Sequence, residues 1–98
     1  MSFTDQLIKF STLSPPLDAL ARMRLSLFDL AACGIAGAAE PEWTGFTAFN
    51  LAQASGPARV LGGGTAPVAT AALVNGTLSH ALDYDDTHFA HIGHPSVA

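Results

Sequence analysis

The spacing of apolar residues along the chain predicts a succession of helices. Phe3, Leu7 and Phe10 recur at intervals of about one helical turn, so the first helix is expected within residues 1–13. Ser14-Pro15-Pro16 ends this helix, because a residue before proline disfavours helix and a proline suits the first turn of the next one. The longest helix is therefore expected over residues 17–38.

That longest helix is apolar around most of its circumference. Its polar residues share one narrow face, and they are Asp18, Arg22, Ser26 and Asp29. So wide an apolar arc predicts burial on most sides of the helix. Gly34 and Gly37, close to its end, leave room for another helix to approach closely.

Shorter elements follow after Glu40-Pro41. A third helix is expected over residues 43–55, then a short extended piece at residues 59–61 and a turn at residues 62–64. The three glycines of this turn are not a phosphate loop, because no Gly-Lys-Ser/Thr follows them. Thr65 is expected to cap a last helix over residues 66–82.

The last predicted helix carries no charged residue, and a helix that is apolar or small all round belongs inside a protein. On one side of this helix, small residues are followed by a histidine near the end of the helix and by an aspartate just beyond it. That side comprises Ala69, Ala72, Leu73, Gly76, His80 and Asp83.

Composition narrows the class of protein. A length of 98 residues suits one small domain, with 49% hydrophobic residues and only 12% charged ones. A net charge of −4 with four Lys and Arg argues against a nucleic-acid partner, which requires a basic face. No apolar run is long enough for a membrane span and no secretory signal is visible, so a cytoplasmic protein is expected. Cys33, the single cysteine, has no internal disulfide partner.

Residues 80–94 hold three aspartates and four histidines. Carboxylates and imidazoles tune one another's proton affinity, which is how proton-transfer catalysts work near neutral pH. An Asp-rich turn with solvated histidines explains the same composition, and both interpretations stay open. Taken singly, Tyr84 and Phe89 are expected to pack, and His80 is expected to be a hydrogen-bonded core histidine.

Two other functions remain open from the residues alone. His88, His91 and His94 recur at every third position beside carboxylates, which offers ligands for a divalent metal. Gly93 and Pro95 oppose a regular helix there, however, so the three imidazoles need not converge. The other alternative is a non-catalytic, truncated helical module that binds a partner through exposed apolar surface.

The stretch from Ala71 to His88, which contains Asn75-Gly76-Thr77 and Asp83-Tyr84-Asp85-Asp86-Thr87-His88, resembles the signature of the MmgE/PrpD family. Gly93-His94-Pro95-Ser96 continues the same signature. The glycine turn at residues 62–64 and the helical residues 25–38 also resemble this family's N-terminal region. The family includes 2-methylcitrate dehydratase, cis-aconitate decarboxylase and iminodisuccinate epimerase.

The resemblance implies an all-α helical bundle that forms the N-terminal part of a larger helical enzyme domain. Family members are several times longer, so residues 1–98 are expected to be a fragment of one domain that packs on the remainder or in a homodimer. The implied enzyme is a lyase or epimerase for small di- and tricarboxylates, most simply a 2-methylcitrate dehydratase. It works without a metal or an organic cofactor, and further lysines and a histidine lie downstream of this sequence.

The resemblance also assigns site residues. Asp83, Thr87 and His94 match positions that line the family's active site, and His91 falls in a segment of variable length. His94 is expected to be the general acid/base, and Asp83 is expected to orient or charge a catalytic cation. Thr87 and His91 are expected to bind the substrate. Asp85 and Asp86 match the motif, and their expected role is to hold the loop through backbone N–H groups.

Overall fold

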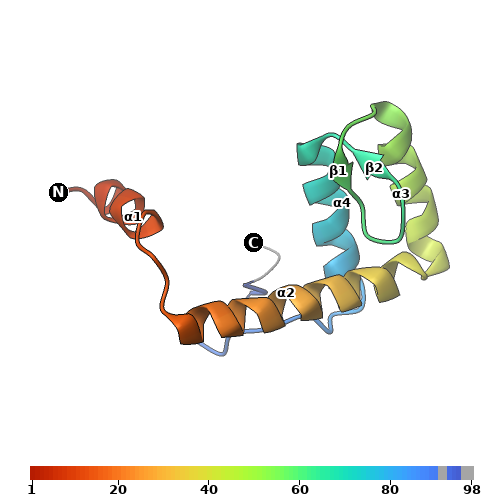
Figure 1. The fold of residues 1–98 in the computed structure, drawn as a ribbon. Helices are drawn as coiled ribbons and strands as arrows, with labels where there is room; N and C mark the ends of the chain where they lie inside the picture. The colour runs from red at the N-terminus through yellow and green to blue at the C-terminus, as the bar shows by residue number, and fades with distance from the viewer. Residues whose placement is uncertain (91–92, 96–98) are drawn as a thin grey trace.

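The protein is described here by a computed structural model in which residues 1–90 and 93–95 are placed. These residues form a mostly helical fold with one two-stranded antiparallel hairpin, which confirms the expected fold class (Figure 1). The elements are α1 (Phe3–Ser11), α2 (Leu17–Ala38), α3 (Pro41–Gln53), β1 (Ala58–Arg59), β2 (Thr65–Ala66) and α4 (Val68–His80). The long α2 lies along one edge, while α3, α4 and the hairpin gather at its C-terminal end (Figure 1).

Local signals are sufficient to explain α1. The hydroxyl oxygen of Ser2 accepts a hydrogen bond from the backbone N–H of Asp5, and the Asp5 carboxylate accepts one from the backbone N–H of Ser2. Hydrogen bonds from the hydroxyl and the backbone N–H of Ser2 lower the pKa of the Asp5 carboxyl. No residue of α1 is buried, and the helix stands apart from the other elements (Figure 1).

The central contact of the fold is the crossing of α2 and α4. Gly34 and Gly37 are buried in it. A Cβ at Gly37 would overlap the backbone carbonyl of Leu78, and one at Gly34 would overlap the Leu61 side chain. The Ser79 hydroxyl also donates to the Leu30 carbonyl oxygen over 3.1 Å. The predicted close approach of a second helix at these glycines is confirmed.

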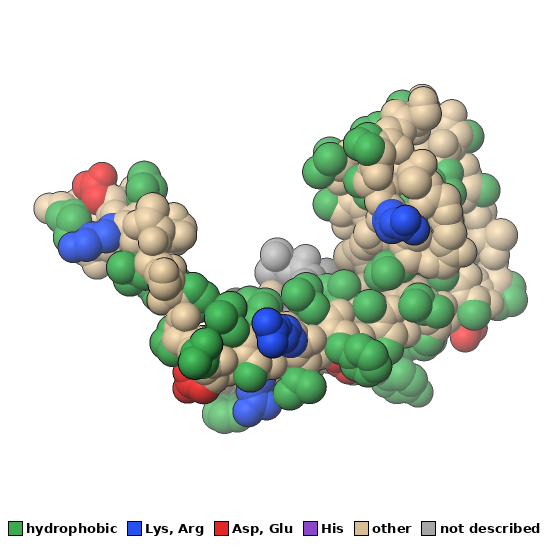
Figure 2. Space-filling view, in the orientation of Figure 1, with side chains coloured by type: hydrophobic (Ala, Val, Ile, Leu, Met, Phe, Trp, Pro, Cys, Tyr) green, Lys and Arg blue, Asp and Glu red, His purple; other side chains and the backbone are tan. Residues whose placement is uncertain are grey.

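The expected burial of α2 on most sides is wrong for the described residues. Leu17, Leu25 and Phe28 are 85%, 63% and 76% exposed, and Figure 2 shows apolar side chains along the helix. The hydrophobic pattern identifies the faces of α2 that are suited to burial, but α4 buries only the stripe of α2 that carries the two glycines. Among the described residues, no helix combines the length and the apolar character needed to cross a bilayer.

A small apolar core lies between α3, α4 and the hairpin. Its buried members are Val60, Ala66, Ala71, Val74 and Leu78. Trp43 and Phe46 of α3 pack against it, with their rings edge to face at 6.0 Å. This core fixes the orientation of α4, and with it the position of the helix end that carries His80.

The hairpin differs from the sequence expectation at its second strand. Gly62, Gly63 and Gly64 all have positive φ, which allows the chain to reverse so that Arg59 pairs with Thr65. Thr65 therefore lies in β2, and its predicted role as the cap of the last helix is wrong. Instead α4 begins at Val68 with Pro67 as its N-cap, and no side chain caps the helix, since proline has no side-chain oxygen to accept a hydrogen bond.

One amide joins the hairpin to α4. The side-chain oxygen of Asn75 accepts from the Leu61 N–H over 2.8 Å, and its nitrogen donates to the Arg59 carbonyl oxygen over 3.0 Å. Both groups of the amide are thus used on the same loop. Asn75 of the Asn-Gly-Thr motif therefore has a structural role, which is to hold the glycine turn against the helix.

Candidate active site

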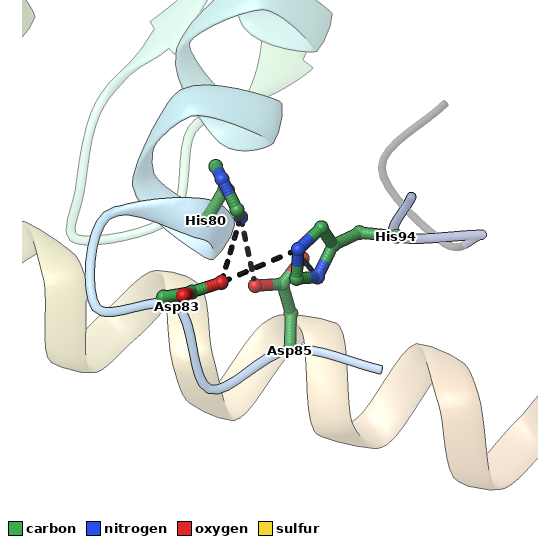
Figure 3. A group of neighbouring side chains, drawn as sticks. All are labelled: His80, Asp83, Asp85 and His94. Carbon is green, nitrogen blue, oxygen red and sulfur yellow. Dashed lines mark hydrogen bonds and ion pairs between the residues drawn. The ribbon is translucent and has the colours of Figure 1, made fainter. Parts of the chain in front are cut away.

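Four titratable side chains meet beyond the end of α4, and we call them the His–Asp cluster: His80, Asp83, Asp85 and His94 (Figure 3). One nitrogen or oxygen atom from each of them lies within 4.8 Å of those of the others. His80 is the last residue of α4, and its carbonyl oxygen accepts from the Asp83 N–H over 3.0 Å. Asp83 adopts a left-handed conformation with φ of 55°, which turns the chain so that Asp85 comes back under His80.

The Asp85 side chain is completely buried between the two histidines. Its Oδ1 lies 3.1 Å from Nδ1 of His80, and its Oδ2 lies 3.0 Å from Nδ1 of His94. The second contact is poorly aligned for a hydrogen bond, and neither of its two atoms has another hydrogen-bond partner among the described residues. A buried carboxylate requires polar partners, and here the imidazole of His80 supplies a hydrogen bond while that of His94 lies in close contact with the other oxygen.

Asp83 faces the same two imidazoles from the solvent side. Its side chain is 79% exposed, and its Oδ1 lies 3.3 Å from Nε2 of His94 and 3.9 Å from Nδ1 of His80. The two imidazole rings are 4.2 Å apart and tilted by 59°. His94 thus has a carboxylate at each ring nitrogen, so its protonated form can donate to both Asp83 and Asp85.

The cluster borders an open pocket of about 710 Å³. The pocket is lined by Trp43, Ala72, Leu73, Gly76, Thr77, His80, Ala81 and Asp83. Five of these residues, Ala72, Leu73, Gly76, His80 and Asp83, belong to the helix side that the sequence singled out, so that grouping is confirmed. The small side chains leave space beside the helix, and His80 and Asp83 of the cluster stand at one end of that space, while Asp85 and His94 are not among the lining residues.

The structure brings together two of the four predicted site residues. Asp83 and His94, which are eleven positions apart in the chain, meet at 3.3 Å. Thr87 is exposed and lies outside both the His–Asp cluster and the residues that line the pocket. The position predicted for His91 lies outside the described residues.

Sequence reasoning missed His80 and Asp85. The side chain of His80 is 49% exposed and lines the pocket, so its interpretation as a core histidine is wrong. The Asp85 carboxylate faces imidazoles rather than backbone N–H groups. The sequence did contain a signal for this grouping. The uncharged helix ends in a histidine and aspartates follow within one turn, so the histidine and aspartate side chains lie at the same end of the helix.

The two aromatic residues of this segment are exposed, so the expectation that they pack is also wrong. Tyr84 is 77% exposed and Phe89 is fully exposed. Phe89 stacks on the imidazole of His88, with ring centres 5.4 Å apart. His88 itself accepts a hydrogen bond from the Ala90 N–H at Nδ1 and lies outside the His–Asp cluster.

The donor atoms of the cluster also suit a metal. Two imidazole nitrogens and two carboxylate oxygens form a ligand set that Zn²⁺ and related transition metals accept. This ligand set differs from the one that the sequence suggested, which was His88, His91 and His94. Of those three histidines, His88 lies outside the His–Asp cluster and His91 lies outside the described residues.

Cys33 of α2 lies close to the acidic side of this region. Burial raises the pKa of its thiol, and the nearby carboxylates of Asp29, Asp85 and Asp86 raise it further. The thiol therefore loses its proton at a higher pH than an exposed cysteine does.

Fold and site together define a helical domain that presents histidine and aspartate side chains to an open pocket. Residues 2–98 match the MmgE/PrpD N-terminal domain, so the chain belongs to the MmgE/PrpD family. Neither a curated protein nor a solved structure was found to match the chain.

Proposed function

We propose that this domain serves an enzyme that transfers protons next to a carboxylate group of a small di- or tricarboxylate. The reaction we favour is a dehydration like that of 2-methylcitrate dehydratase. The observation that carries the proposal is the His–Asp cluster at the end of a pocket whose helical wall is made of small residues. Membership of the MmgE/PrpD family supports the class of enzyme.

In such a dehydration, a proton leaves the carbon next to a carboxylate and a hydroxyl group leaves the neighbouring carbon. The departing hydroxyl requires a proton, and we assign its delivery to His94 as general acid. Asp83, which contacts Nε2 of His94 and lines the pocket, orients the charged imidazole toward the substrate. Thr87 and His91 are proposed to bind a carboxylate or hydroxyl group of the substrate.

The proposal requires positive charge that the described pocket does not supply. None of the described residues that line it is Lys or Arg, and the sequence has no Lys or Arg after Arg59. An anionic substrate near two carboxylates requires cationic partners. We propose that these come from a part of the enzyme outside the 98 residues, and that this part or a second subunit covers the exposed apolar faces of α2. The 98 residues alone are then expected to be catalytically inert.

Kinetics of the complete enzyme with methylcitrate and cis-aconitate test the role of His94. His94→Gln should lower kcat by about 10²–10⁴-fold with little change in KM, as expected for a lost acid/base group. His88→Gln is the matched control, because His88 lies outside the His–Asp cluster. A His94→Gln enzyme that changes only in KM would contradict the acid/base role, and full turnover by the 98-residue chain would contradict the need for further residues.

The convergence of four ligand atoms favours one other candidate function, a divalent-metal site. Titration with Zn²⁺ by calorimetry distinguishes the two. A metal enzyme should bind one ion per chain and lose activity after dialysis against a chelator. The metal-independent enzyme that we favour should keep its full turnover after the same treatment.

A further inference from the structure

We infer that Asp85 positions two imidazoles at once, and that His80 is a second proton-transfer group beside His94. The chemistry of His80 rests on the proposed function, whereas the positioning by Asp85 is a property of the fold. The geometric basis is that each oxygen of one fully buried carboxylate faces Nδ1 of a different histidine, at 3.1 Å and 3.0 Å.

The buried carboxylate determines where neutral His80 carries its proton. An ionised carboxylate only accepts hydrogen bonds, so a ring nitrogen that faces it must carry the hydrogen. In His80 this nitrogen is Nδ1, and the lone pair is then on Nε2 of a half-exposed side chain that lines the pocket. His94 faces a carboxylate at both ring nitrogens, Asp85 at Nδ1 and Asp83 at Nε2, so the same rule places a hydrogen on its Nδ1 and makes its Nε2 the nitrogen that gives up a proton.

Asp83 is not able to replace Asp85 in this positioning role. Its side chain is 79% exposed, and its carboxylate is 3.9 Å from His80, beyond hydrogen-bond distance. It contacts His94 at Nε2, the nitrogen that the proposed chemistry uses. The two aspartates therefore have different tasks: Asp85 fixes the rings from within the fold, and Asp83 acts at the surface of the pocket.

Two imidazoles meet the needs of a dehydration. Nε2 of His80 takes the proton from the carbon next to the carboxylate, and the electron pair of the broken C–H bond forms the new C=C bond. The C–O bond breaks, its electron pair leaves with the hydroxyl oxygen, and His94 delivers the proton that makes water. His80 then holds one proton more and His94 one fewer, and water in the open pocket returns the proton between turnovers.

The tautomers can be measured without any activity. In ¹⁵N-histidine-labelled protein, the ring nitrogen shifts should show the Nδ1–H form for neutral His80 and a hydrogen on Nδ1 of His94. His88 is an internal reference of the opposite kind, because its Nδ1 accepts a hydrogen bond and its proton must be on Nε2. Signals are assigned with His80→Gln, His94→Gln and His88→Gln. Finding the Nε2–H form for His80, or no hydrogen on Nδ1 of His94, would overturn the positioning role.

Asp85→Asn sharpens the test. An amide of the same shape accepts at one end and donates at the other, so one of the two histidines should switch to the Nε2–H form. Asp86→Asn is the matched control and should leave both tautomers unchanged. Retention of both Nδ1–H forms in Asp85→Asn would also overturn the inference. If this variant does not fold, the tautomers of the unsubstituted protein decide.

Turnover of the complete enzyme decides the role of His80. His80→Gln should lower kcat by about 10²–10⁴-fold with a KM close to that of the unsubstituted enzyme. An active enzyme in which His80→Gln leaves kcat unchanged would refute proton transfer by His80, while His94 and the proposed function stand. An enzyme without turnover on any polycarboxylate would refute the proposed function, and the tautomers would still decide the role of Asp85.

Discussion

The α2–α4 crossing predicts opposite effects for the same substitution at two glycines. Gly37 and Gly45 both lie inside helices, so Gly→Ala gains about 0.5–1 kcal/mol of helix propensity at either position. At Gly45 an added Cβ meets nothing within 4 Å. At Gly37 it overlaps the Leu78 carbonyl oxygen and comes within 3.1 Å of the Ala81 Cβ. Since the obstacle at Gly37 is mainly backbone, α4 itself must move.

The difference between the two variants isolates that steric cost, because the propensity gain cancels. Overpacking of this kind costs about 1–3 kcal/mol, so Gly37→Ala should be less stable than Gly45→Ala by this amount. Each kcal/mol corresponds to roughly 4–8 °C in Tm for a domain of this size. Urea unfolding followed by circular dichroism measures the difference. If Gly37→Ala were as stable as Gly45→Ala, the proposed close contact between α2 and α4 would be wrong.

Two further predictions concern the hairpin and the thiol. Asn75→Ala should destabilise the fold by about 1–3 kcal/mol, because the Leu61 N–H and the Arg59 carbonyl lose their partner. The matched control is Asn50→Ala, because the Asn50 amide forms a hydrogen bond only within its own helix. Equal urea midpoints for the two variants would refute the stabilising role of the Asn75 amide. Because the pKa of Cys33 is raised in the folded state, its alkylation by iodoacetamide should become fast at a higher pH in native than in urea-unfolded protein. The native state then keeps the thiol proton up to a higher pH than the unfolded state does, so the free energy of unfolding should fall as pH rises above the ordinary thiol pKa. If Cys33→Ala left this alkaline decrease in stability unchanged, the prediction would be wrong.

The parts of the fold that were predictable from sequence are those with local causes. The bounds of α2 agree with the expected residues 17–38, because a proline pair precedes this helix and Glu40-Pro41 follows it. Gly34 and Gly37 indicated a helix contact, since residues without a side chain let a neighbouring helix approach closely. The strand position of Thr65 was not predictable in the same way, because pairing with Arg59 across the glycine turn competes with capping.

The candidate site was predictable in its composition and not in its grouping. The sequence shows that aspartates and histidines are dense after α4, but not which of them meet. The grouping depends on the left-handed turn at Asp83 and on the return of residues 93–95, which brings His94 to Asp85. The exposure of His80 likewise depends on the orientation that the core gives to α4. These are tertiary effects that a one-dimensional pattern does not contain.

The backbone at Asp83 links the stability of the domain to its evolution. For an L-residue, the left-handed conformation costs about 1–2 kcal/mol, and glycine adopts it without that cost. Selection for heat resistance alone should therefore replace this aspartate with glycine and remove a carboxylate from the pocket. Under the role proposed for Asp83, a homologue with glycine at this position would retain the architecture and lack the carboxylate that the proposed reaction uses, so this one position separates, in a set of sequences, chains that could follow the proposed mechanism from chains that could not.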